Sequence, residues 1–192
     1  MSQPLESLTK DHFIWGNLLE KRTLTLFRGV DAALARETIE ALLFLDDQDS
    51  SKPIYLYVNS PGGEVNSGFA IYDTIKFIKS EVKIVCSGLC ASIATIILIG
   101  AEKENRLSLP NSRFLIHQPL LRGGIQGQAT DIQIHSEQIL KTRSKINDLL
   151  AKECGQPLDR VSVDTERDYW MDANESLEYG LISKIIKDKS EL

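Results

Sequence analysis

Residues 54–100 read IYLYVNSPGGEVNSGFAIYDTIKFIKSEVKIVCSGLCASIATIILIG, and this stretch decides the fold class. It opens with the β-rich run 54–58, which stops at the turn-forming sequence NSPGG of residues 59–63. Residues from about 65 to 78 have the composition of a helix, and residues 82–86 then suit a buried strand. The stretch therefore predicts a strand, a helix and a second strand in succession.

The flanking sequence continues this alternation. Residues 91–100 are almost wholly apolar and predict a third helix, which belongs in a core because it is apolar on every side. Upstream, residues 23–27 alternate polar and apolar like a half-buried strand, and residues 34–44 have helical spacing. Downstream, residues 114–116 predict another short strand. Strands that alternate with helices indicate an α/β fold.

Residues 130–153 are the longest helix candidate. Thr130 or Asp131 is the expected N-cap and Gly155 the expected stop. At about 1.5 Å per residue the helix would exceed 30 Å, so we expect it to project towards a partner. Two short helices (158–165 and 174–179) and a last strand (181–186) complete a single domain of residues 1–192.

The composition excludes several classes of protein. The chain has 192 residues, a net charge of −5 and no long basic run, so a nucleic-acid surface is not expected. Its three cysteines cannot all pair within one chain and contain no C-x-x-C, which favours a reducing compartment. The longest apolar run is too short for a bilayer, and no basic-then-apolar leader is visible. We therefore expect a cytoplasmic protein without membrane contact.

The glycine pair of residues 59–63 is the first feature that could carry chemistry. Two glycines directly after a strand can expose consecutive backbone N–H groups, as an oxyanion hole or anion site requires. An ordinary tight turn is the more frequent explanation of such a pair. No phosphate-loop pattern is present.

Ser92 is expected at the first turn of the apolar helix. Unsatisfied N–H groups there would stabilise an alkoxide and the oxyanion that it creates. The alternative is a serine that only caps the helix, and in isolation this alternative is the stronger. The G-x-S-x-G pattern of a nucleophile elbow is absent.

His117 and Asp168 are the remaining candidates. His117 is the one histidine of three that ends an apolar strand, where a general base would be rigidly held. A core histidine bonded to a carbonyl is the alternative. Asp168 ends the cluster 164–168 and precedes Tyr169 and Trp170, a setting in which a carboxylate could orient an imidazole. The other interpretation of this cluster is a solvated helix end.

Together these features supply a nucleophile, a base, an orienting carboxylate and backbone donors, which are the parts that acyl transfer needs. No metal site is expected, because no H-E-x-x-H, C-x-x-C or dense histidine and aspartate cluster occurs.

At these residues the sequence resembles the ClpP family of proteolytic subunits, from about residue 18 to residue 186. The matching segments are NSPGG, PNSR, IHQP, GQATDI, DTERD and EYGL, at residues 59–63, 110–113, 116–119, 127–132, 164–168 and 178–181. As a set they are far more specific than any one motif.

The resemblance implies a crotonase/ClpP-like spiral of β-β-α units with a long projecting handle helix, in the region of about 120–155. It further implies two stacked heptameric rings around a chamber, with residues 1–17 as an axial segment. A hexameric AAA+ Clp unfoldase would feed unfolded polypeptides into the chamber. That partner would use the ATP, so no cofactor is expected in this chain.

Carried over residue by residue, Ser92 is the nucleophile, His117 the general base and then acid, and Asp168 the orienting carboxylate. The backbone N–H groups of Gly63 and Ile93 would form the oxyanion hole. The resemblance also places an ATPase-docking groove at six residues: Tyr55, Tyr57, Phe77, Leu107, Leu109 and Ile186.

Some residues depart from the family pattern. Cys90 and Ile93 replace the usual alanine and methionine beside the nucleophile, and about two extra residues lie near Leu121 and Arg122. Ser87 occupies a usually apolar groove position. These departures suggest, as the alternative, a divergent or regulatory ClpP paralogue with low intrinsic activity that needs a second ClpP-type subunit. An acyl-CoA enzyme of the same fold is a more remote alternative.

Overall fold

The computed structural model describes residues 10–120 and 127–192, and side chains from Phe13 onward within those ranges. The extra residues predicted near Leu121 and Arg122, and most of the predicted axial segment 1–17, lie outside the described residues. Residues of that segment from Lys10 onward belong to a helix that we had not predicted, α1.

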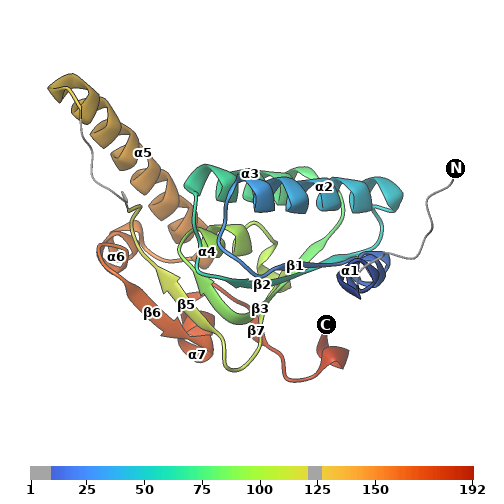
Figure 1. Cartoon of the computed structure of the whole chain (residues 1–192). Helices are drawn as coiled ribbons and strands as arrows, with labels where there is room; N and C mark the ends of the chain where they lie inside the picture. The colour runs from blue at the N-terminus through green and yellow to red at the C-terminus, as the bar shows by residue number, and fades with distance from the viewer. Residues whose placement is uncertain (1–9, 121–126) are drawn as a thin grey trace, which may run out of the picture.

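The structure alternates strands and helices, with a mostly parallel sheet (Figure 1). The helices are α1 (Lys10–Glu20), α2 (Ala32–Gln48), α3 (Val65–Phe77), α4 (Ile93–Leu98), α5 (Ala129–Cys154), α6 (Leu158–Asp164) and α7 (Ala173–Tyr179), with short 3-10 turns η1 (Lys103–Asn105) and η2 (Lys189–Glu191). The strands are β1 (Thr23–Leu26), β2 (Ile54–Ser60), β3 (Val82–Ala91), β4 (Arg106–Ser108), β5 (Arg113–Ile116), β6 (Tyr169–Asp172) and β7 (Lys184–Ile185). The predicted α/β class is confirmed.

Strand β3 organises the sheet because it pairs with different neighbours along its length. Its first half lies between β2 and β4 in the parallel order β1-β2-β3-β4-β7. Gly88, with φ of 104°, lies between the two halves. Beyond it, residues 89–91 pair with β5, which in turn pairs antiparallel with β6. The predicted strand 82–86 is therefore too short, and the predicted helix 91–100 begins later, at Ile93.

Helices α2 and α3 cover one face of the sheet, and α4 packs beside α3 (Figure 1). Asp31 caps α2, since its side chain accepts from the Leu34 backbone N–H at 2.7 Å. The main core lies between these helices and the inner face of the sheet, where Leu26, Leu56 and Ile84 are fully buried. Apolar burial of this kind stabilises a fold by roughly 25 cal/mol per Å².

Helix α5 extends away from the body of the molecule (Figure 1). It ends at Gly155 in the left-handed conformation, as predicted. It begins at Ala129 after Gln128, so the predicted caps Thr130 and Asp131 are wrong. At about 1.5 Å per residue its 26 residues span roughly 39 Å. Within the part of the chain that the structure describes, no helix is long and apolar enough to cross a membrane.

Candidate active site

Ser92 lies at the corner between β3 and α4, with φ of 57° and ψ of −128°. This conformation lies outside the regions that an L-residue ordinarily adopts and costs about 1–3 kcal/mol. The Ser92 N–H donates to the Leu115 carbonyl at 2.8 Å, which helps to hold the corner. The side chain makes no capping hydrogen bond, so Ser92 is not a capping serine. Its hydroxyl is left for another partner.

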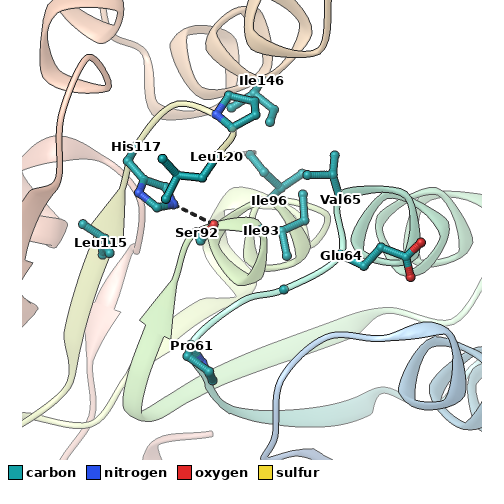
Figure 2. Close-up of a pocket in the computed structure, with 12 residues that line it drawn as sticks. Pro61, Glu64, Val65, Ser92, Ile93, Ile96, Leu115, His117, Leu120 and Ile146 are labelled. Carbon is teal, nitrogen blue, oxygen red and sulfur yellow. Dashed lines mark hydrogen bonds between the residues drawn. The ribbon is translucent and has the colours of Figure 1, made fainter. Parts of the chain in front are cut away.

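His117 is that partner. It follows β5, and the pairing of Ala91 with Leu115 places the ends of β3 and β5 side by side. The His117 Nε2 atom lies 2.8 Å from the Ser92 Oγ atom (Figure 2). The imidazole is only 13% exposed, so neighbouring side chains hold it in place.

Asp168 is the third side chain of this hydrogen-bonded set. It precedes β6, and the antiparallel pairing of Ile116 with Tyr169 places Asp168 opposite His117. Its Oδ1 atom lies 2.9 Å from His117 Nδ1. The carboxylate is 61% exposed, so its interaction with the imidazole is screened by water more than that of a buried aspartate. The structure thus brings the three predicted side chains into one hydrogen-bonded line.

The loop before Asp168 is fixed by contacts that sequence reasoning missed. The backbone N–H of Gln118 donates to the Thr165 carbonyl at 2.7 Å, and its side chain donates to the Glu166 carbonyl at 2.8 Å. The buried Thr165 hydroxyl donates to Asn147 of α5 at 3.0 Å. The sequence signal in this loop is the DTERD motif of residues 164–168, within which Thr165 is the one residue without a charge.

The glycine turn passes directly against the nucleophile corner. A Cβ atom on Gly62, whose φ is 83°, would lie 2.6 Å from the Ala91 carbonyl oxygen and 2.7 Å from Ser92 Cβ. Val30 secures the turn, donating to the Gly62 carbonyl at 2.9 Å and accepting from the Glu64 N–H at 2.7 Å. The turn is therefore a structural one, as the simpler interpretation held, and it also brings its backbone to the site.

The two predicted oxyanion donors remain unengaged. Neither the Gly63 N–H nor the Ile93 N–H donates to an acceptor within residues 10–120 and 127–192. Gly63 and Ile93 both border the same cleft as Ser92. Such unengaged N–H groups beside a nucleophile can stabilise a developing oxyanion.

The cleft around these groups has a volume of about 540 Å³. Aliphatic side chains dominate its wall, and Glu64 lies at one side (Figure 2). Its aliphatic lining consists of Val65, Ile93, Ile96, Leu115, Leu120 and Ile146. Ile93, one of the residues that depart from the family pattern, lines this wall, although its side chain is mostly buried against Gly68 of α3.

The cysteines are poor competitors for the role of nucleophile. Cys86, Cys90 and Cys154 are free and buried. Burial raises the pKa of the Cys154 thiol to about 12, and it also raises the pKa of Cys86. Thiols of this kind stay protonated and inert. Among the described residues, no group of three histidine, cysteine, aspartate or glutamate side chains could hold a metal ion.

Most of the predicted docking-groove residues gather on the outer face of the sheet. Leu107 and Ile186 are buried there with Val85, and Tyr57 and Leu109 pack against them. Tyr55 and Tyr57 line a neighbouring hollow. Phe77, at the end of α3, is 81% exposed and belongs to neither group within the described part of the chain. Two further residues of this outer cluster, Val85 and Leu192, were not predicted from the sequence.

A family model for the Clp protease matches residues 8–189, which is nearly the whole chain. The chain belongs to the Clp protease family. Membership supports a peptidase, and the serine of the cleft fits the serine type. The Clp protease family consists of oligomeric proteases that work with Clp ATPases.

Proposed function

We propose that this Clp protease family member is a serine endopeptidase that hydrolyses unfolded polypeptides to short peptides. One observation carries the proposal: Asp168, His117 and Ser92 form a continuous hydrogen-bonded line at the wall of a cleft. Asp168 would orient His117, His117 would act as general base, and Ser92 would be the nucleophile.

The reaction would proceed by acyl transfer. Ser92 Oγ attacks the peptide carbonyl while His117 Nε2 takes its proton, and the Gly63 and Ile93 N–H groups stabilise the oxyanion. The C–N bond then breaks, the departing amine takes the proton from His117, and an acyl-enzyme remains. Water, deprotonated by His117, releases the second peptide. The chain itself would need no metal or cofactor.

The same proposal includes the assembly. We expect two stacked heptameric rings with the active sites facing an inner chamber, the spiral of β-β-α units as the repeated fold, and α5 as the handle that joins the rings. A hexameric AAA+ Clp unfoldase would dock at the outer groove and supply unfolded chains, using its own ATP. The compartment would be the cytoplasm.

The test is hydrolysis of a short fluorogenic peptide by the purified chain, with particle mass measured on the same samples. Ser92→Ala should reduce turnover by about 10⁶-fold, to background, because the nucleophile is lost. Ser144→Ala, an exposed serine of α5, is the matched control and should retain full activity. Equal turnover by Ser92→Ala and the unmodified chain would refute the proposal.

The second candidate is the divergent or regulatory paralogue that needs a second ClpP-type subunit. Its support is the exposure of Asp168 in the single chain, which leaves room for a neighbouring subunit to complete the site. A fluorophosphonate that labels Ser92 in the absence of any other subunit would favour the independent peptidase. Labelling and turnover that begin only when a second subunit is added would favour the paralogue.

A further inference from the structure

The sheet has a second apolar face, opposite the one that α2 and α3 cover. A single register row crosses β1, β2, β3, β4 and β7 through Thr25, Tyr57, Val85, Leu107 and Lys184. The apolar members of this row form a cluster of their own, separate from the main core. Because side chains alternate along a strand, this row points away from the residues that fill the main core.

The end of the described chain folds back onto this face. Leu192 packs against the outer cluster and is partly buried there. Residues 187–192 reach this position through the short turn η2, at the side of the molecule away from α6 (Figure 1).

A set of hydrogen bonds holds the turn closed. Asp188 accepts from the Ser190 N–H at 2.8 Å, and Glu191 Oε1 accepts from the N–H groups of Lys187 and Asp188 at 2.7 and 2.8 Å. Lys184 of β7 donates to the Glu191 carbonyl at 3.2 Å. The two backbone donors lower the pKa of Glu191, so this carboxylate is ionised when the turn is formed. Residues 188–192 therefore have a defined conformation, which we call the latch.

The latch covers only part of the apolar face. Beside Leu192 a hollow of about 780 Å³ remains, bordered by Leu18, Tyr55, Tyr57 and the latch residues. An extended loop from a partner could place an apolar side chain in this hollow. To reach the buried row of Val85 and Leu107, it would have to displace Leu192.

We propose that the latch is an internal competitor for the docking face, and that Leu192 occupies the position that an aliphatic side chain of a Clp ATPase loop would take. This inference rests on the proposed docking of a Clp ATPase at this face. For a partner that binds only chains with an open latch, the apparent Kd equals the intrinsic Kd divided by the fraction of chains that are open. Opening the latch should therefore strengthen docking.

Two latch variants test this, each with a matched control. Leu192→Ser removes the apolar contact and Glu191→Ala removes the acceptor that closes the turn. Leu158→Ser alters an exposed leucine of α6 and Glu178→Ala an exposed glutamate of α7, both outside the latch. The probes are 1-anilinonaphthalene-8-sulfonate, which reports accessible apolar surface, and a purified Clp ATPase in a direct binding assay.

Loss of one half-buried leucine contact should raise both the dye signal and the ATPase affinity by about fivefold in the latch variants alone. An unchanged dye signal, or an equal rise in the controls, would overturn the latch. Weaker ATPase binding by the latch variants would also overturn it, because Leu192 would then be part of the docking surface. A dye signal that rises while no variant binds the ATPase would support the latch and count against the proposed docking, and peptide hydrolysis by the unmodified chain tests the peptidase separately.

Discussion

Ser92 owes its availability to a backbone conformation rather than to its side chain. With φ of 57° it turns the chain between β3 and α4, and its Oγ atom faces His117 instead of the helix end. Strain of this kind persists only where the surroundings impose it. Two contacts impose the conformation of Ser92: its N–H donates to the Leu115 carbonyl, and the backbone of Gly62 lies directly against it.

We predict that Gly62→Ala will abolish peptide hydrolysis and lower the free energy of unfolding by about 2 kcal/mol or more, because the new Cβ would collide with Ala91 and Ser92. Gly16→Ala is the control, since a Cβ there meets nothing within 4 Å. Hydrolysis rates and urea unfolding of the three proteins check this. Full activity of Gly62→Ala would show that the close pass does not position Ser92.

We predict that Asp168→Asn will reduce kcat by about 10³-fold with little change in stability, because the amide favours the wrong tautomer of His117 while the exposed site tolerates it. Fluorophosphonate labelling should slow by a similar factor. Glu166→Gln is the control, since Glu166 lies nearby, pairs with Arg143 at 2.5 Å and does not contact His117. A kcat within tenfold of the unmodified chain would remove Asp168 from the reaction.

At the scale of elements, α3 and α4 meet at a contact that allows no extra atom. A Cβ on Gly68 of α3 would lie 2.1 Å from Ile93 Cγ1 of α4. Since Ile93 also borders the cleft, this contact sets where α4 lies relative to the nucleophile.

We predict that Gly68→Ala will destabilise the fold by about 1–3 kcal/mol through overpacking, despite the better helix propensity of alanine. Ile93→Ala alone should cost about 2–5 kcal/mol. The double variant should cost less than the sum of the two by about 1–2 kcal/mol, because the new methyl group fills the vacated space. Unfolding of all four proteins in urea measures the coupling, and strict additivity would contradict the proposed contact.

A second element contact joins the end of α5 to the core. Arg106 of β4 is 1% exposed and pairs with Glu153, near the end of α5. Its guanidinium also donates to the carbonyls of Ala101 and Ile99 at 2.8 and 3.2 Å. Through Arg106, the C-terminal end of α5 is therefore linked to residues 99–101, which follow α4.

We predict that Arg106→Met will destabilise the fold by about 3–5 kcal/mol, because a mostly buried carboxylate and several carbonyls lose their partner. Arg36→Met is the control, since the pair of Arg36 with Glu40 is more than 60% exposed on both sides and is screened by water and salt, so its loss should change stability little. Urea unfolding midpoints of the two variants measure the difference between their losses of stability. A similar small cost for both would show that the buried pair does not anchor α5.

At the scale of the whole molecule, the apolar residues in the first half of α5 are left exposed by residues 10–120 and 127–192. Ile132, Ile134 and Leu140 are 38%, 51% and 61% exposed, whereas Ile146 and Leu150 are buried against the body. A long helix whose apolar residues are exposed at the far end is typical of an interface between subunits.

On the proposed assembly of two stacked rings joined by α5, we predict that Ile134→Ser combined with Leu140→Ser will halve the particle, from two rings to one, because the proposed apolar contact between α5 helices is lost. Mass photometry and analytical ultracentrifugation measure the particle. Val163→Ser, an exposed apolar residue of α6, is the control and should leave the mass unchanged. A double variant that keeps the full mass would show that α5 does not join the rings.

Much of this protein could be predicted from local pattern. The order of strands and helices from residue 23 to residue 98 and the stop of α5 at Gly155 follow from periodicity, turn residues and apolar runs. These properties depend on neighbours within a few residues, which a sequence displays directly. The resemblance to the ClpP family assigned the roles of nucleophile, base and orienting carboxylate to Ser92, His117 and Asp168, which were already candidates by pattern.

Tertiary structure decided the rest. The continuation of β3 to Ala91 and the short strands β4 and β6 depend on ladder partners distant in sequence. Whether Ser92 caps a helix or meets His117 depends on the pairing of β3 with β5, and whether Asp168 reaches His117 depends on the pairing of β5 with β6. Long-range pairing brings together side chains up to 76 positions apart in the chain, from Ser92 to Asp168, and no local propensity encodes that distance.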